Sequence, residues 1–340
     1  MEDFSDRHHV EQIRQALWRG GPFGKAAIMV GAGFSRNADS SNGIAREFPL
    51  WPDLVKHLYD AIHPRKASES DESRKRQYER HYATSAALRL AEEYAVGFGR
   101  TRLDELLSKA IPDLDYSPGK LHHLLLRLPW SDIFTTNYDT LLERARDFVS
   151  ERAYEVVQTK EDIPVATRPR IIKLHGSFPS HRPFIFTEED YRTYPREFPA
   201  FVNMVQQSIM ENILCLVGFS GDDPNFLNWA GWVRDILGRS TLKVYLCGLL
   251  NLTDSTRQMF HSRHVIPIDL SAVVPTSVFP DSGRRHRIAM EWFLLSLENG
   301  RPPDRSLWPM NRNIAFTSPS PGVPPPLGSS HRMMQPERTL

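Results

Sequence analysis

The hydrophobic pattern opens with a helix and continues into a buried strand. Between His8 and Arg19 the apolar residues recur at helical spacing, and the Gly-Gly-Pro that follows ends the helix. Ala26–Val30 is then a short apolar run that passes directly into Gly31-Ala32-Gly33. A run bounded in this way is typical of a buried parallel strand that turns into a phosphate-facing loop.

The pattern changes twice after this strand. From Pro52 to about Lys120 it indicates helices, including the charged stretch SESDESRKRQYER. Beyond that point the apolar runs IFTTN, IIKLHG, ILCLVGFS and KVYLCGLL alternate with amphipathic helical patterns. This alternation is typical of a parallel sheet covered by helices. The sequence therefore predicts an α/β fold: a Rossmann-like parallel sheet with helices on both faces and a helical insertion at about residues 52–120.

The same patterns suggest how the chain is divided. We expect an N-terminal helix in residues 1–25, one α/β domain over residues 26–270, and a C-terminal helix region at residues 271–300, where AMEWFLLSL is amphipathic. Residues 301–340 are rich in Pro, Ser and Arg. Because such a composition buries little apolar surface, we expect this tail to be disordered or bound to a partner.

Charge and hydropathy exclude several partners. The 42 Lys and Arg residues balance 41 Asp and Glu residues, so no basic excess points to direct nucleic-acid binding. No apolar run approaches the roughly 20 residues that a membrane span needs, and the N-terminus is polar rather than basic and then apolar. We therefore expect a cytoplasmic protein that binds no membrane.

The potential metal ligands are few. Cys215 and Cys247 each lie inside an apolar run, which favours small buried side chains over a disulfide. His8-His9 and His122-His123 are adjacent pairs whose members point to different faces of a helix, with no Cys, Asp or Glu to complete a ligand set. The sequence predicts no metal.

Gly31 and Gly33 form the first candidate site. Glycines let backbone approach a bound anion closely, and the N–H groups that follow, with the Ser35 hydroxyl, are suited to hydrogen-bond a pyrophosphate. The usual dinucleotide fingerprint has a third small residue three positions after Gly33, where this chain has Arg36. A plain Rossmann dehydrogenase is therefore disfavoured, and glycines that serve only a tight turn stay the alternative.

Two further polar clusters follow predicted strands. Thr135-Thr136-Asn137-Tyr138-Asp139 follows one apolar run, and Lys173-Leu174-His175-Gly176-Ser177 ends another. Polar residues at the carboxyl ends of strands occupy the crevice where open α/β sheets bind ligands. A lone histidine in such a place is more often structural than catalytic. Two clusters that end two strands nevertheless favour a shared site for Asn137 and His175.

The motifs GAGFS, TTNYD and KLHGS, in this order, resemble the GAG, QN-D and HG motifs of the sirtuin family. The resemblance is closer to the bacterial sirtuin-like NAD⁺ hydrolases of anti-phage defence, which carry TTNYD where sirtuins carry TQNID. The block GFSGDDPN, Gly218 to Asn225, resembles the later Gly-Ser segment of the family, which contacts ribose and phosphate. The N-terminal helix, the insertion and everything beyond about Leu270 lie outside the resemblance.

This resemblance implies roles for particular residues. NAD⁺ is the implied substrate, Asn137 positions the reacting ribose and the water, and His175 is the general base, since an imidazole accepts a proton near neutral pH. Asp139 is expected to order the loop or bind ribose. The residues implied to bind the dinucleotide are Gly31, Ala32, Gly33, Phe34, Ser35, Arg36, Thr136, Asp139, Gly218, Ser220, Asp223 and Asn225.

Departures from the sirtuin pattern reduce the number of activities that the resemblance implies. Protein-deacylating sirtuins carry a four-cysteine zinc module, which two isolated cysteines cannot build. The sirtuin run Pro-Asp-Phe-Arg is replaced by Ala45-Arg46-Glu47-Phe48, so the loop over the nicotinamide cannot be carried over. The resemblance thus implies an NAD⁺ hydrolase of anti-phage defence, with nicotinamide and ADP-ribose as products and cyclic ADP-ribose as a variant. A sensor or scaffold that binds NAD⁺ or ADP-ribose without turnover, and an NAD⁺-dependent deacylase, stay as alternatives.

An NAD⁺ hydrolase needs a gate, because uncontrolled turnover would kill its host. The roughly 70 residues after Leu270 leave little room for a sensor domain, so we expect a separate activating partner. By analogy with two-component defence systems, that partner is a HerA-type hexameric ATPase. We also expect a homo-oligomer that uses the first helix, the insertion and the tail.

Overall fold

The computed structural model describes residues 4–19, 23–40, 48–84, 87–179, 181, 183–219 and 223–299. The predicted tail at residues 301–340 and the predicted contact residue Ser220 lie outside these residues, as does the run from Ala45 to Glu47. The described residues all belong to one unit of the chain, which ends at Pro303.

Seven parallel strands form the central sheet, in the order β5-β6-β4-β1-β7-β8-β9. Without the edge strand β5, this is the order 3-2-1-4-5-6 of the Rossmann fold. The chain first builds outward from β1 on one side and then crosses to β7 on the other, so the topological switch point lies between β1 and β7. The bounds of the strands are β1 Ala26–Val30, β4 Asp132–Thr135, β5 Glu155–Val157, β6 Arg170–Lys173, β7 Ile213–Val217, β8 Val244–Gly248 and β9 Val265–Asp269.

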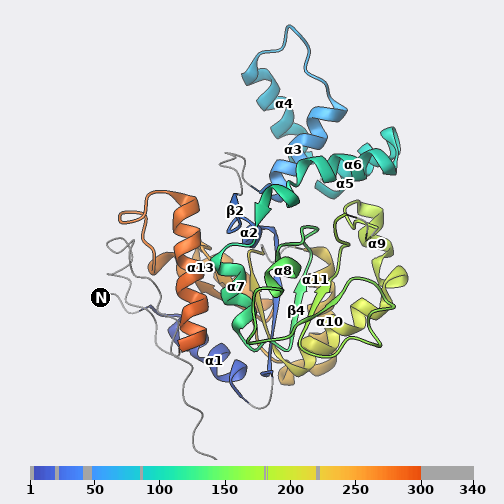
Figure 1. Cartoon of the computed structure of the whole chain (residues 1–340). Coiled ribbons are helices and arrows are strands. Elements are labelled where there is room, and N and C mark those ends of the chain that lie inside the picture. Colours follow the sequence, from blue (N-terminus) through green and yellow to red (C-terminus); the bar gives the residue numbers. More distant parts are fainter. Residues whose placement is uncertain are drawn as a thin grey trace, which may run out of the picture. The chain divides into compact units, whose positions relative to one another are not determined.

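Helices cover both faces of this sheet, as the sequence predicted. Alternate residues of β1, such as Ala27 and Met29, pack with side chains of α9, α10, α11 and α12 in one apolar cluster. On the other side, α1 contacts β1 and β7, and α13 joins α1 to α7 and β8 (Figure 1). The bounds are α1 Arg7–Leu17, α7 Lys120–Arg127, α8 Leu141–Arg146, α9 Glu188–Glu197, α10 Pro199–Glu211, α11 Pro224–Leu237, α12 Asp254–Ser262 and α13 Ser282–Asn299.

The predicted helical insertion is also present. It consists of α3 Trp51–Ile62, α4 Asp71–Thr84, α5 Ala87–Phe98 and α6 Arg100–Ala110. A small second sheet pairs β2 Asp39–Ser40 with β3 Tyr116–Ser117, just before and just after the insertion. Helix α2 Ala32–Ser35 lies between β1 and β2, and the short helix η1 Asp113–Asp115 directly precedes β3. The short helices η2 Gly238–Ser240 and η3 Leu270–Ala272 follow later in the chain.

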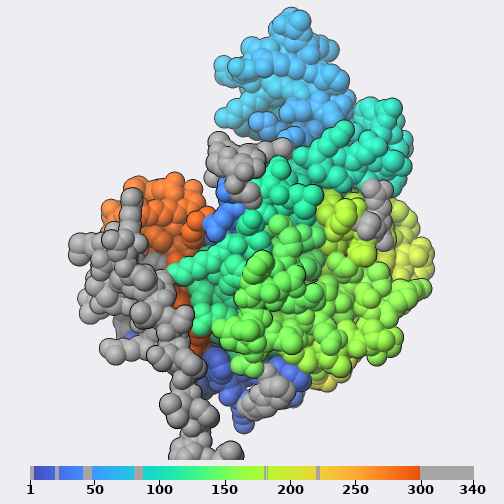
Figure 2. Space-filling model, viewed as in Figure 1, coloured from blue at the N-terminus to red at the C-terminus, as the bar shows by residue number. Residues whose placement is uncertain are grey.

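The insertion is fixed to the sheet body through α9. The Arg100 guanidinium donates to both carboxylate oxygens of Asp190 at 2.8 Å, and it also donates to the Phe184 carbonyl. The Glu189 backbone N–H donates to Glu92 of α5 at 3.2 Å. In Figure 2 the cyan surface of α6 adjoins the yellow-green surface of α9. These charged contacts with α9, a helix that the sequence pattern did not single out, add to an apolar cluster in which the insertion packs with Phe184 and Phe186.

Candidate functional site

The four sequence motifs begin at one level of the sheet. Val30 of β1 lies in register with Thr135 of β4 and with Val217 of β7, and Thr135 lies in register with Lys173 of β6. Because the strands are parallel, the residues that follow each strand emerge at the same edge. The shared site that the two polar clusters predicted is thus formed by strand register.

A cavity of about 620 Å³ opens at this edge, within the range of small-molecule and cofactor sites. Ten of the sequence-predicted residues line it: Gly31, Ala32, Gly33, Ser35, Thr136, Asn137, Asp139, His175, Gly218 and Asp223. Three predicted residues are not part of its lining. Phe34 is buried with its ring 5.2 Å from the ring of His122, and Arg36 is exposed. Asn225 is buried directly behind His175.

The glycines of the first motif pack backbone against backbone at the switch point. The N–H groups of Gly31 and Gly33 donate to the carbonyls of Val217 and Gly218, at 3.0 and 2.9 Å. A Cβ on Gly31 would lie 2.4 Å from the Gly218 oxygen. Close approach of two loops therefore accounts for these glycines. Two of the amides in the loop predicted to face a pyrophosphate are already used within the fold.

Ser35 joins two of the strand-end residues. Its hydroxyl donates to Asp139 Oδ2 at 2.7 Å and accepts from Asn137 Nδ2 at 2.9 Å. Asp139 is buried, and burial raises the pKa of its carboxyl, while the Lys173 ammonium and the Ser35 hydrogen bond oppose that rise. The Ser35 hydroxyl, predicted to bind a phosphate, instead fixes the amide of Asn137 and the carboxylate of Asp139.

The buried Lys173 side chain holds the loop that carries Asn137 and Asp139. The Lys173 ammonium donates to the Asp139 carbonyl and pairs with Glu143 Oε1 at 3.0 Å. Asp139 Oδ1 accepts from the Leu141 backbone N–H at 3.2 Å, at the start of α8. The loop that carries Asn137 is thus held at several points, which lowers the entropic cost of presenting its side chain to a ligand.

His175 is buried and lines the same cavity as Asn137. Its Nε2 lies 3.5 Å from Asn225 Nδ2, and the ring stands edge-on to Tyr191 at 5.3 Å. Burial lowers the pKa of His175 below its ordinary value, and the nearby charges of Asp223 and Asp190 partly offset this. The imidazole is therefore neutral at physiological pH, the state that can accept a proton.

Tyr191 is a cavity residue that the sequence did not reveal. Its hydroxyl donates to Asp223 Oδ2 at 3.0 Å, and Asp223 Oδ1 accepts from the Phe226 backbone N–H, which caps α11. Burial raises the pKa of Tyr191 well above its ordinary value, so the phenol keeps its proton for this bond. No local pattern marks Tyr191, because α9 places it in the cavity only through tertiary packing.

The opposite wall of the cavity is apolar and comes from the insertion and the segments beside it. Its residues, also missed by sequence reasoning, are Phe48, Pro49, Leu50, Trp51, Pro52, Leu54, Ala87, Leu88 and Ile111. The cavity thus combines convergent polar groups at the sheet edge with a hydrophobic cover, which is the usual composition of a site for an aromatic, polar ligand.

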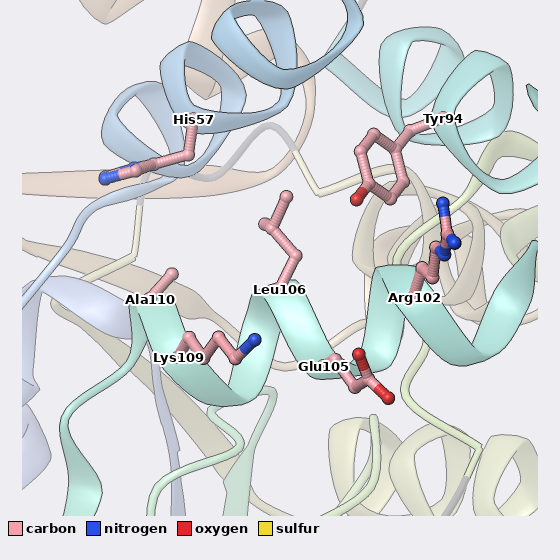
Figure 3. Close-up of a pocket in the computed structure, with 7 residues that line it drawn as sticks. All are labelled: His57, Tyr94, Arg102, Glu105, Leu106, Lys109 and Ala110. Carbon is pink, nitrogen blue, oxygen red and sulfur yellow. The ribbon is translucent and has the colours of Figure 1, made fainter. Parts of the chain in front are cut away.

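A second cavity, of about 370 Å³, lies on the insertion alone (Figure 3). His57 of α3 and Tyr94 of α5 face the α6 residues Arg102, Glu105 and Lys109 across it. The three α6 side chains are exposed, and they carry opposite charges. Among the described residues, its lining includes none of the strand-end groups, so the larger cavity is the candidate active site.

Metal-binding and membrane features were also sought within the described ranges. There, no group of three His, Cys, Asp or Glu side chains is placed to hold a metal ion, and Cys215 and Cys247 are buried free thiols. No described helix is both long and apolar enough to cross a membrane.

The fold and the cavity define a Rossmann-type α/β protein with a ligand site at its switch point. Residues 131–268 match the family model described as SIR2-like domain. The predicted resemblance to the sirtuin family is confirmed by this match.

Three curated relatives are similar to parts of this chain. The chain is 23% identical to defense-associated sirtuin 2 of Bacillus subtilis over 86% of this chain and 28% of that protein. It is 29% identical to NAD(+) hydrolase ThsA of Acinetobacter baumannii over 58% of this chain and 37% of the relative. It is 25% identical to NAD(+) hydrolase ThsA of Enterococcus faecium over 66% of this chain and 43% of that relative. The chain thus spans less than half the length of each of these relatives.

One similar solved structure is a Sir2 homolog–NAD complex, with a TM-score of 0.43 and 11% identity, covering 87% of this chain and 95% of that one.

Proposed function

We propose that this chain hydrolyses NAD⁺ to nicotinamide and ADP-ribose and that it depletes NAD⁺ in anti-phage defence. The observation that carries the proposal is the convergence of Asn137, Asp139 and His175 on one cavity at the switch point of a SIR2-like domain. Relatives named as NAD(+) hydrolases and as a defense-associated sirtuin support it.

The chemistry breaks the C–N bond between ribose C1′ and nicotinamide, and the bonding pair leaves with nicotinamide. Positive charge develops on the ribose, water attacks C1′, and a water proton passes to a base. Asn137, held by Ser35, orients the ribose and the water. His175 is neutral and receives the proton, and Asp139 binds ribose or orders the loop.

Two other functions fit the same cavity less well. A protein that binds NAD⁺ or ADP-ribose without turnover has no need of both Asn137 and a neutral buried imidazole. A zinc-dependent deacylase needs four clustered cysteines, whereas the chain has two. Stoichiometric zinc together with release of acetyl groups from an acetyl-lysine peptide would favour the deacylase.

The partners are part of the proposal. We propose a homo-oligomer and a separate activator, with a HerA-type hexameric ATPase as the leading candidate. The region matched in each relative is less than half of that relative's length, so the activity and partners of the whole relatives are proposals for this chain.

The test is NAD⁺ consumption and nicotinamide release, followed by chromatography, with the protein alone and with the ATPase. We expect Asn137→Ala and His175→Ala each to lower turnover by about 10² to 10⁴. His261→Ala, an exposed histidine on α12, is the matched control and should retain full activity. Wild-type turnover that persists in both active-site variants would refute the assigned roles, and calorimetric binding of NAD⁺ with no turnover would favour the sensor.

A further inference from the structure

The C-terminal helix contributes an unassigned histidine to the cavity. His286 of α13 lines the cavity together with Gly31 and Gly33 of the loop after β1. Its Nε2 atom is buried and has no hydrogen-bond partner among the described residues. A buried polar nitrogen without a partner is costly, at about 1–3 kcal/mol, so it calls for a ligand atom.

The charge around His286 indicates what kind of ligand atom that is. Burial lowers the pKa of His286, the positive charge of nearby Arg36 lowers it further, and a hydrogen bond with the Gly33 backbone opposes both. A neutral imidazole beside a guanidinium presents a nitrogen and a positive field to the same region. A bound anion favours the protonated imidazolium, whose Nε2–H donates to an acceptor oxygen, and the diphosphate is the anionic part of a dinucleotide.

We propose that His286 hydrogen-bonds the diphosphate of the bound dinucleotide through Nε2, on the Gly31–Gly33 side of the cavity. This rests on the proposed function only in taking NAD⁺ as the dinucleotide. The contact belongs to binding rather than to bond cleavage, because His286 of α13 lies beside the loop after β1, whereas Asn137 and His175 follow β4 and β6.

Two substitutions of His286 distinguish the effect of the Nε2 hydrogen bond from the effect of the ring's volume. His286→Phe keeps an aromatic ring and removes the nitrogen, and His286→Gln returns an amide near the position of Nε2. His261→Ala on α12 is again the exposed control. Thermal melts of all variants exclude a loss of folding as the cause, and if His286→Phe does not fold, His286→Gln and His286→Ala carry the comparison.

Binding is measured by calorimetry with ADP-ribose, ADP and adenosine. We expect His286→Phe to lower the affinity for ADP-ribose and for ADP about tenfold, which is the effect of losing one hydrogen bond to a charged group. The affinity for adenosine should not change. His286→Gln should recover part of the loss. In turnover, KM for NAD⁺ should rise by a similar factor while kcat changes much less.

The outcomes separate this inference from the proposed function. The inference is overturned if His286→Phe binds ADP and ADP-ribose with the same affinity as wild type. It is also overturned if the affinity for adenosine falls by the same factor as that for ADP. A wild-type protein that binds neither ADP-ribose nor ADP also overturns it. If wild type cleaves no NAD⁺ but binds ADP in a manner that depends on His286, the hydrolase fails and the inference stands.

Discussion

At the scale of single residues, burial sets the charge states in and near the cavity. His175 and His286 share a lowered pKa whose largest cause is burial, while the same cause raises the pKa of Asp139. In each case the neutral form gains.

The lowered pKa of His175 predicts the pH profile of hydrolysis. A general base works in its neutral form, so kcat/KM should fall on the acid side only below about pH 6.5, the ordinary imidazole value. Asp223→Asn removes a charge that raises this pKa, and the acid limb should then move to still lower pH. A fall of kcat/KM that begins above pH 6.5 would contradict the role of His175 as general base. Circular dichroism at each pH controls for unfolding.

His122 predicts a pH dependence of stability. Burial lowers its pKa to about 3, so below pH 6.5 the unfolded chain takes up a proton that the folded chain refuses. Stability from this residue is therefore complete above pH 6.5 and is lost as the pH falls toward 3. At pH 5 the loss is about 2 kcal/mol, since each pH unit corresponds to about 1.4 kcal/mol.

The matched variant is His122→Asn, which keeps an acceptor for the Gly119 N–H but does not titrate. Free energies of unfolding from urea titrations at pH 7 and pH 5 should differ by about 2 kcal/mol less in this variant than in wild type. Equal pH dependence in the two proteins would mean that His122 is protonated in the fold.

At the scale of elements, the contact between the loops after β1 and β7 builds the switch point. Gly218 has φ of +59°, and a Cβ there would lie 2.2 Å from the Phe34 backbone nitrogen. A substitution must both strain the backbone and push the β1 loop away. The geometry of Gly31 to Ser35, and through Ser35 the amide of Asn137, depends on this contact.

We predict that Gly218→Ala lowers the free energy of unfolding by about 2 kcal/mol or more, because of the left-handed backbone and the backbone clash. Turnover of NAD⁺ should fall as well. Gly231→Ala on α11 is the control: a Cβ there meets nothing within 4 Å, and alanine in a helix should raise stability by up to about 1 kcal/mol. Equal stability of the two variants in urea denaturation would argue against a close loop contact.

At the scale of the whole molecule, the first helix serves the fold of its own chain. Val10, Ile13 and Leu17 are buried, and α1 packs on β1, β7 and α13. This fits the view that the helix covers the sheet of the monomer, so the proposed self-assembly depends more on the exposed charged helix α4 of the insertion and on the tail.

We predict that the full-length protein is an oligomer of several subunits. If assembly controls the cavity, NAD⁺ turnover of the oligomer should differ from that of the isolated protomer, because assembly can change activity only by favouring one conformational state over another. Light scattering of the full chain and of a chain ending near Gly300 tests this. A monodisperse monomer of 39.0 kDa with full hydrolase activity would remove both the assembly and the gate built on it.

The sequence by itself determined the sheet strands β1, β4, β6, β7 and β8, the helices on both faces, the helical insertion and the motifs that follow the strands. These features are local: an apolar run or a helical period is complete within one segment, and a polar residue after a buried strand lies at the sheet edge whatever the rest of the chain does. Only the tertiary structure decided that the glycine amides are used between two loops, that Ser35 holds Asn137 and Asp139, and that Tyr191 and His286 enter the cavity. These contacts join residues far apart in the chain, and no local pattern encodes which distant side chain a packed helix turns toward the site.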